Sequence, residues 1–199
     1  MAGQRQTADK MASGNGQIRI IGGQWRGRKL PVADLPGLRP TTDRVRETLF
    51  NWLMFELQGA RVVDLFAGSG ALGFEAASRG AAQVTLVERH DGVARMLAAN
   101  IERLKAAERV QLVTGDALRF AATAPAEPVD LLFVDPPFAQ GLLRELLPLL
   151  ATPSWLRPGG WLYVEYESQL ALSPPPGFSL HRQLKAGAAT AQLWRRDGN

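Results

Sequence analysis

The chain has 199 residues, a net charge of +4 and no cysteine, and 46% of its residues are hydrophobic. This length and composition are typical of one compact globular domain with room for a small appendage. The lack of cysteine excludes disulfides, cysteine-ligated metal sites and any mechanism that uses a cysteine nucleophile. No uncharged apolar run approaches the roughly 18 residues that a membrane helix needs, so we expect no membrane span.

Positive charge is concentrated near the amino terminus. Residues 1–46 contain nine Lys/Arg and three Asp/Glu, whereas residues 47–199 contain fourteen and sixteen. A basic arm on a slightly acidic body favours a polyanionic partner such as a nucleic acid, although a solvated basic surface has the same composition. Residues 1–17 are polar and lack the apolar stretch of a signal peptide, so we expect a flexible tail and a cytoplasmic protein.

The basic extension follows this tail and covers residues 18–59. Its first part, residues 19–31, is predicted to form a hairpin or an extended arm. Thr42 or Asp43 can then cap a helix, and five apolar residues fall on one face of that helix. Such a stripe indicates packing against the main domain. Its members are Val45, Leu49, Trp52, Leu53 and Leu57.

Residues 60–199 show alternating strand and helix patterns, which predict an α/β domain built on a mostly parallel sheet. β-branched and apolar runs predict the strands, and Ala/Leu-rich segments predict the helices. The expected strands are 61–66, 83–88, 110–113, 129–135 and 161–166, the expected helices are 71–79, 92–107 and 142–150, and 178–184 with 190–194 is expected to form a terminal antiparallel pair.

A glycine-rich turn follows the first of these strands, in the sequence Asp64-Leu-Phe-Ala-Gly68-Ser69-Gly70-Ala-Leu-Gly73. Glycines permit a tight turn and a close approach of the backbone to a ligand. The free N–H groups of the following helix can bind an anion, such as a pyrophosphate or the carboxylate of a methionine moiety. The motif alone fits a dinucleotide site equally well, and glycines also serve in turns that bind nothing.

Two further acids follow the next two strands. Glu88 ends the second strand twenty residues after Gly68, where a carboxylate can accept both hydroxyls of an adenosine ribose. That role suits NAD and S-adenosylmethionine alike, and an exposed acid at a strand end is the alternative. Asp116 follows the third strand and can accept a hydrogen bond from an adenine amino group or cap a helix.

The fourth strand ends in Asp135-Pro136-Pro137-Phe138, and this tetrapeptide is expected beside the glycine turn because ligands bind beyond the carboxyl ends of parallel strands. The prolines stiffen the loop and remove two N–H groups. The Asp135 carboxylate, the Pro136 carbonyl and the Phe138 ring remain, and they suit a planar molecule that carries an NH₂ group. The two acceptors can aim the nitrogen lone pair at a methyl donor.

In this order and spacing, the glycine turn, Glu88, Asp116 and Asp135-Pro-Pro-Phe138 resemble the motifs of class I methyltransferases. The amino-terminal motifs narrow the resemblance to the RsmD family, which are bacterial small-subunit ribosomal RNA guanine-N(2) methyltransferases. This resemblance runs from about residue 18 to residue 194. The motifs that carry it are Arg19-Ile-Ile-Gly-Gly-Gln-Trp-Arg-Gly-Arg-Lys-Leu30, Leu38-Arg-Pro-Thr41 and Arg44-x-Arg-Glu-Thr-Leu-Phe-Asn-Trp52.

The resemblance implies a Rossmann-like sheet of seven mostly parallel strands with helices on both faces, and S-adenosylmethionine as the cofactor. It implies that Asp135 to Phe138 hold a flipped guanine of 16S ribosomal RNA, in free RNA or in the small ribosomal subunit. The implied cofactor residues are Asp64, Gly68, Ser69, Gly70, Glu88 and Asp116, and the implied contacts to RNA phosphates are Arg26, Arg28, Lys29, Arg39, Arg44 and Arg46.

Other functions remain compatible with the motifs. A DNA adenine or protein glutamine methyltransferase also needs a site for a planar NH₂ group. A nicotinamide oxidoreductase would leave Asp135-Pro-Pro-Phe138 without a role, and a non-catalytic RNA-binding module would bind no cofactor. His90 and His181 have no metal partners in sequence, so we expect a protein without a metal. Trp25 is expected to pack in the core, and we expect a monomer because no pattern indicates an apolar interface.

Overall fold

The computed structural model describes residues 16–33, 42–138 and 140–198. The tail expected at residues 1–17 therefore lies almost wholly outside the described residues, and so does Arg39. Within the described part of the chain, none of the helices combines the length and the apolar character that crossing a bilayer requires.

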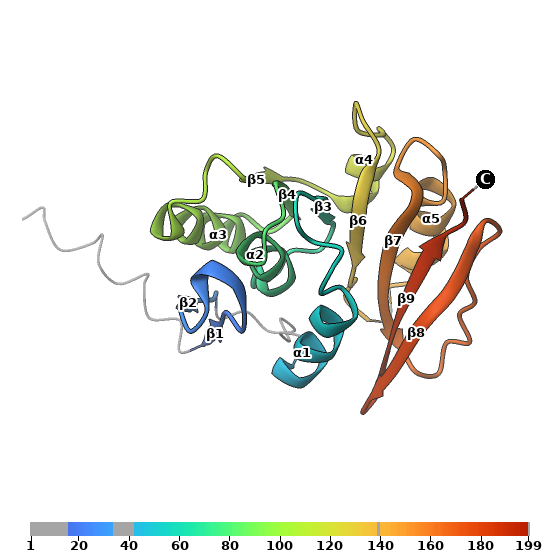
Figure 1. The fold of residues 1–199 in the computed structure, drawn as a ribbon, viewed down its shortest axis with the longest axis horizontal. Coiled ribbons are helices and arrows are strands. Elements are labelled where there is room, and N and C mark those ends of the chain that lie inside the picture. The colour runs from blue at the N-terminus through green and yellow to red at the C-terminus, as the bar shows by residue number, and fades with distance from the viewer. Residues whose placement is uncertain (1–15, 34–41, 139, 199) are drawn as a thin grey trace, which may run out of the picture.

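A seven-stranded sheet forms the centre of the molecule, in the order β5-β4-β3-β6-β7-β9-β8 (Figure 1). The first five of these strands are parallel, and β9 runs antiparallel to both β7 and β8. The predicted α/β fold and its terminal antiparallel pair are thus confirmed. The strands are β3 (Arg61–Asp64), β4 (Gln83–Glu88), β5 (Val110–Thr114), β6 (Val129–Val134), β7 (Leu156–Glu167), β8 (Phe178–Ala186) and β9 (Ala189–Arg196).

Strand β7 begins five residues earlier than the pattern predicts, at Leu156 rather than Trp161. Its pairing with β6 jumps from Val129 opposite Leu156 to Leu131 opposite Trp161. The residues between these two pairs bulge out of the ladder. The segment Pro158-Gly-Gly160 just before the predicted start therefore lies in a bulge within one strand, since a bulge adds residues to one strand without ending the pairing.

Helices cover both faces of the sheet, as expected. Helices α1 (Asp43–Trp52), α2 (Ala71–Ser78) and α3 (Asp91–Leu104) contribute to one apolar cluster. Helices α4 (Ala117–Ala121), which the pattern does not predict, and α5 (Leu142–Leu150) contribute to a second cluster. Within β6, Phe133 belongs to the first cluster and Leu132 and Val134 to the second, because successive strand residues point to opposite faces.

The amino-terminal extension packs into the first cluster. Strands β1 (Gln17–Arg19) and β2 (Lys29–Pro31) pair in antiparallel fashion around a short 3-10 helix, η1 (Gly23–Trp25), which confirms the hairpin. The Oγ1 atom of Thr42 accepts a hydrogen bond from the Val45 amide and caps α1. Four of the five stripe residues are buried, and Trp52 packs against the cluster from a partly exposed position. The extension and the sheet therefore share one core.

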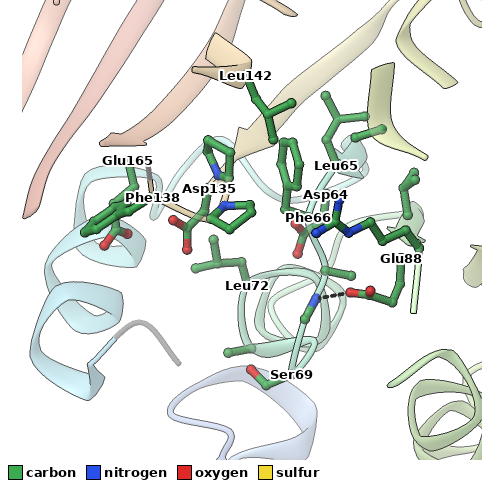
Figure 2. A pocket seen from close by; sticks show the side chains of 18 of the residues that line it. Asp64, Leu65, Phe66, Ser69, Leu72, Glu88, Asp135, Phe138, Leu142 and Glu165 are labelled. Carbon is green, nitrogen blue, oxygen red and sulfur yellow. Dashed lines mark hydrogen bonds between the residues drawn. The ribbon is translucent and has the colours of Figure 1, made fainter. Parts of the chain in front are cut away.

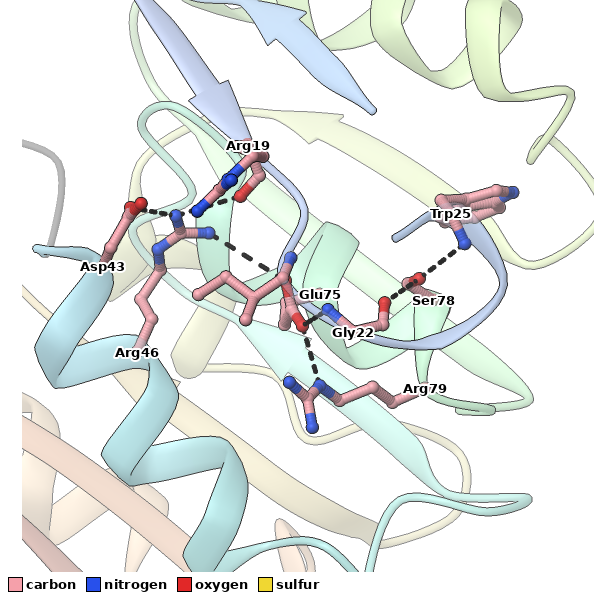
Figure 3. A network of polar contacts seen from close by, with 9 residues as sticks. Arg19, Gly22, Trp25, Asp43, Arg46, Glu75, Ser78 and Arg79 are labelled. Carbon is pink, nitrogen blue, oxygen red and sulfur yellow. Dashed lines mark hydrogen bonds and ion pairs between the residues drawn. The ribbon is translucent and has the colours of Figure 1, made fainter. Parts of the chain in front are cut away.

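A fully buried carboxylate joins the hairpin to helix α2 (Figure 3). The side chain of Glu75 accepts hydrogen bonds from the amides of Ile21 at 2.8 Å and Gly22 at 2.7 Å, and from Nε of Arg79 at 2.7 Å. Ser78, one turn further along α2, donates to the Gly22 carbonyl and accepts from the Trp25 amide. The polar groups at the hairpin bend are thus satisfied by one helix.

The structure corrects one expectation about the arm, because Arg46 is only 1% exposed. Its Nη2 atom donates to Asp43 at 2.5 Å and to the carbonyl of Arg19 at 3.0 Å, and its Nη1 atom lies 3.9 Å from Oε2 of Glu75 (Figure 3). The prediction that Arg46 contacts RNA phosphates is therefore wrong, since its charge is used inside the protein. Trp25 is 6% exposed, which confirms its packing role.

Candidate active site

An acidic side chain lies at the carboxyl end of each of the five parallel strands. In the order of the sheet, Asp116 follows β5, Glu88 ends β4, Asp64 ends β3, Asp135 follows β6 and Glu165 lies near the end of β7. All five line one cavity of about 760 Å³, and Figure 2 labels Asp64, Glu88, Asp135 and Glu165 around it. Cavities of this size hold ligands as large as a nucleotide derivative. The sheet thus arranges five acids along the length of a single site.

The glycine turn joins β3 to α2 and forms the floor of this cavity. Gly70 has a φ of +78°, and a Cβ atom there would lie 2.4 Å from the Phe74 ring. At Gly73 a Cβ atom would lie 2.2 Å from Leu86 of β4, so this glycine lets α2 pack closely on the sheet. Gly68 and Ser69 line the cavity directly. The first turn of α2, whose N–H groups have no partner within the helix, also borders the cavity through Ala71 and Leu72.

Asp64 lies at the bottom of the site and is 1% exposed. Burial raises the pKa of its carboxyl from 3.8 to about 7, although hydrogen bonds from the backbone at Phe66 and Gly73 act in the opposite direction. Its Oδ1 atom has no hydrogen-bond partner among the described residues. A buried oxygen without a partner at a cavity wall is a position where a ligand can donate a hydrogen bond.

Glu88 is held against the glycine turn (Figure 2). Its Oε2 atom accepts from the Gly68 amide at 3.0 Å, and its Oε1 atom accepts from the His90 amide at 2.8 Å. A carboxylate has about four acceptor sites, so both oxygens retain capacity for a diol. Asp116 caps α4 through the Arg119 amide at 3.0 Å and also lines the cavity. The helix-cap interpretation of Asp116 is therefore confirmed, and its contact with an adenine amino group stays a prediction.

The tetrapeptide Asp135 to Phe138 continues from β6 along the opposite half of the cavity, and all four residues line it. The Phe138 ring is 44% exposed, whereas Pro136 is buried. Leu72 and Leu142 add apolar walls (Figure 2). An exposed aromatic face beside a carboxylate provides both stacking and hydrogen-bond acceptance for a planar ligand.

Glu165 is a cavity residue that the sequence motifs did not predict. Its Oε2 atom accepts a hydrogen bond from the Tyr163 hydroxyl at 2.9 Å, and burial raises the pKa of its carboxyl, against the effect of that hydrogen bond. The pKa of Tyr163 is raised well above its ordinary value by burial and by the nearby carboxylates of Glu165 and Asp135. An acid inside the apolar run from Trp161 to Tyr166 was the signal in the sequence, because an internal strand position rarely carries an unpaired charge.

Two other walls of the cavity were not predicted either. Thr42 and Val45 of the extension line the cavity, and so do Ala186, Ala188 and Ala189 at the turn between β8 and β9.

The predicted arm residues Arg26, Arg28, Lys29 and Arg44 are exposed and lie outside the cavity lining. Within the described ranges, no group of three or more His, Asp or Glu side chains is placed to hold a metal ion. His90 instead caps α3 through Nδ1, and His181 packs on Trp161.

Known proteins resemble this chain over nearly its whole length. A family model described as "Conserved hypothetical protein 95" matches residues 18–195. The curated "Ribosomal RNA small subunit methyltransferase D" of Escherichia coli is 52% identical over 186 residues, which are 93% of each chain. The protein of the same name from Haemophilus influenzae is 42% identical and covers 90% of this chain and 94% of its own.

A solved structure agrees with these sequence matches. The Escherichia coli protein yhhF is 50% identical and superimposes with a TM-score of 0.85 over 92% of this chain and all of its own. The match with the family model spans the amino-terminal hairpin, the glycine turn, Asp135-Pro-Pro-Phe138 and the antiparallel strands. The chain therefore belongs to the RsmD family, which its amino-terminal motifs resemble.

Proposed function

We propose that this protein transfers a methyl group from S-adenosylmethionine to the exocyclic 2-amino group of a guanine in small-subunit (16S) ribosomal RNA. One observation carries the proposal: the glycine turn and Asp135-Pro-Pro-Phe138 line the same cavity, on adjacent strands β3 and β6. A methyl donor bound at the first would lie beside an amine bound at the second. The names of the curated relatives support the ribosomal substrate.

The residues present fit S-adenosylmethionine. The first turn of α2 after Gly68, Ser69 and Gly70 offers N–H groups to the methionine carboxylate, and the orphaned Oδ1 atom of Asp64 offers an acceptor to its ammonium group. Glu88 would accept the ribose hydroxyls and Asp116 the adenine amine, and the order of β3, β4 and β5 along the sheet supports this assignment. The cofactor supplies an activated methyl group, so the protein needs mainly to position the two reactants.

On the substrate side, Asp135 and the Pro136 carbonyl would accept the two hydrogens of the guanine 2-amino group. This orients the nitrogen lone pair and stabilises the positive charge that develops on nitrogen as the new bond forms. The Phe138 ring would hold the flipped base by stacking. The proton then leaves the methylated nitrogen, either to Asp135 or to water, so no strong base is required.

The extension, residues 18–59, would act as an RNA-contacting arm on the methyltransferase domain, residues 60–199. Its exposed cations Arg26, Arg28, Lys29 and Arg44 are available for phosphates, and we extend the same role to Arg39. We further propose that the enzyme works as a monomer, since no sequence pattern indicates an apolar interface. It would meet its ribosomal substrate in the cytoplasm.

The test is transfer of labelled methyl from S-adenosylmethionine to small-subunit particles and naked ribosomal RNA from cells that lack the enzyme, and to DNA. Asp135→Ala is the site variant, and Asp197→Ala, an exposed acid near the carboxyl terminus, is the matched control. We expect label in ribosomal RNA as N2-methylguanine, lost by about 100-fold or more in Asp135→Ala and retained in the control.

Other outcomes distinguish the rival functions. Label only in DNA adenine would keep the cofactor and Asp135-Pro-Pro-Phe138 but contradict the proposed substrate. Binding of a nicotinamide cofactor in place of S-adenosylmethionine would favour an oxidoreductase. RNA binding without transfer, unchanged in Asp135→Ala, would favour a non-catalytic module.

A further inference from the structure

The row of acids extends one strand beyond the residues that the proposed reaction uses. Asp116, Glu88 and Asp64 lie on the half of the cavity assigned to the cofactor, and Asp135 lies at the start of the substrate half. Glu165 is the next acid along the sheet, on β7. It therefore lies on the far side of Asp135 from the half of the cavity assigned to the cofactor.

The register of β6 and β7 places Glu165 beside Asp135. Val134 is opposite Val164, and both point into the second apolar cluster. The next residue of each strand, Asp135 and Glu165, is therefore directed to the other face, the one that Tyr163 occupies. Figure 2 shows the side chains of Glu165, Asp135 and Phe138 gathered at one end of the cavity.

The Tyr163 hydroxyl is a hydrogen-bond donor to the Glu165 carboxyl. The pKa of Tyr163 lies well above its ordinary value, so the phenol keeps its proton. Its hydroxyl donates a hydrogen bond to Oε2 of Glu165. This hydrogen bond uses one of the roughly four acceptor sites of the carboxylate, on Oε2. Glu165 lines the cavity and consequently retains acceptor sites for a ligand.

We propose, on the basis of the proposed function, that Glu165 accepts the N1–H of the target guanine and thereby selects guanine over adenine. The guanine Watson–Crick edge carries two adjacent donors, the 2-amino group and N1–H, and these match Asp135 and Glu165 in turn. Adenine carries an amino group next to an N1 lone pair, which would face the carboxylate of Glu165. A buried acceptor left against another acceptor is strongly unfavourable.

Tyr163 is the positioning residue in this arrangement. Its ring is fully buried in the first cluster, edge-on to Phe133 at a centroid distance of 6.0 Å. The hydroxyl is thereby fixed, and through it the Glu165 carboxylate is aimed at the cavity. Removing that hydroxyl would leave Glu165 chemically intact but less well placed.

The test compares RNA in which the target nucleotide, once mapped, is either guanine or 2-aminopurine. The analogue keeps the 2-amino group but has an unprotonated N1. Wild-type enzyme, Glu165→Gln, Tyr163→Phe and the control Glu167→Gln, an acid on the same strand outside the cavity lining, are assayed for kcat/KM on both RNAs. Binding of S-adenosylmethionine is measured for each to establish that the fold is intact.

In Glu165→Gln we expect kcat/KM on guanine to fall on the order of 10- to 100-fold, with S-adenosylmethionine affinity unchanged. The preference for guanine over 2-aminopurine should shrink at least tenfold, because the glutamine NH₂ can donate to the analogue's N1. Tyr163→Phe should shrink the preference less, and Glu167→Gln should leave it unchanged.

An unchanged preference in Glu165→Gln, while wild-type enzyme methylates guanine, would overturn the role of Glu165 and leave the proposed function in place. Should Glu165→Gln fail to bind S-adenosylmethionine, the preference in Tyr163→Phe decides: an unchanged value overturns the role. Wild-type enzyme that methylates adenine instead of guanine would overturn both proposals.

Discussion

The Oε2 atom of Glu88 accepts a hydrogen bond from the amide of Gly68 at 3.0 Å. One carboxylate therefore supports the glycine turn and faces the position proposed for the cofactor ribose. The same contact joins the ends of β3 and β4, which are neighbours in the sheet. Any ligand that binds Glu88 is consequently linked to the conformation of the turn.

This contact predicts the behaviour of Glu88→Gln. The amide side chain can accept from only one atom and loses the charge, so we expect the affinity for S-adenosylmethionine to fall roughly 10- to 100-fold, since hydrogen bonds to charged groups contribute about 1.5–3 kcal/mol. Isothermal titration calorimetry measures this, with Glu102→Gln on the exposed face of α3 as the control. An affinity within twofold of wild type would contradict the assignment of Glu88.

The raised pKa of Asp64 should make the free energy of unfolding depend on pH. Its pKa is 3.8 when unperturbed and about 7 in the folded protein. Between these values the unfolded chain releases this proton while the folded chain retains it, so the free energy of unfolding falls as pH rises from about 4 to 7. The contribution of this group amounts to at most roughly 4 kcal/mol and is constant above pH 7.

Asp64→Asn tests this prediction, because the asparagine does not titrate. Urea unfolding of both proteins without ligand, at constant ionic strength from pH 4 to 8, gives the difference in free energy at each pH. We expect wild type to lose stability relative to the variant as pH rises. A difference that stays constant across this range would show that Asp64 titrates normally.

The buried network around Glu75 predicts a large loss of stability. In Glu75→Ala, the amides of Ile21 and Gly22 lose their acceptor, and Arg46 keeps a buried charge with less compensation. Removal of one member of a buried ionic network costs about 3–5 kcal/mol. Glu75→Gln should lose less stability than Glu75→Ala, because the carbonyl oxygen of glutamine can still accept a hydrogen bond from a backbone amide. Urea unfolding ranks the variants, and Glu102→Ala, an exposed acid, should change little.

The exposed cations of the arm predict a change in salt dependence. Replacing Arg26, Arg28, Lys29 or Arg44 by alanine should weaken RNA binding and reduce the slope of log K against log salt by about 0.7 to 0.9 for each phosphate that the variant no longer neutralises. Arg195→Ala is the control, since Arg195 pairs with Trp161 at the end of the sheet remote from the cavity. Slopes equal to that of the control would contradict the prediction that the arm contacts RNA phosphates.

Much of the fold could be predicted because its signals are local. Periodicity identified α1 and β3. The helical stripe was predicted to reach Leu57, but α1 ends at Trp52, and Leu57 is buried from the segment that follows the helix. The cavity could be anticipated as well. Residues that follow parallel strands meet at one edge of a sheet, so the order of Asp64, Glu88 and Asp135 was enough to bring them together.

Long-range contacts determined two features that the sequence did not predict, the burial of Arg46 and the bulge in β7. Arg46 belongs to a basic cluster in the sequence, yet Glu75, 29 positions away, and the carbonyl of Arg19 draw it into the interior. The bulge between Leu156 and Trp161 depends on pairing with β6, which the Pro-Gly-Gly pattern alone does not specify.

By itself, the sequence determined the α/β class, the order of the sheet-edge acids and the RsmD motifs, because each depends on spacing along the chain. Only the tertiary structure decided which charges face solvent and which acid stands next to Asp135. Glu165 lies thirty residues from Asp135, and the register of two parallel strands makes them neighbours. Register depends on how the core-facing residues of both strands match each other, so the pattern of one strand alone does not specify it.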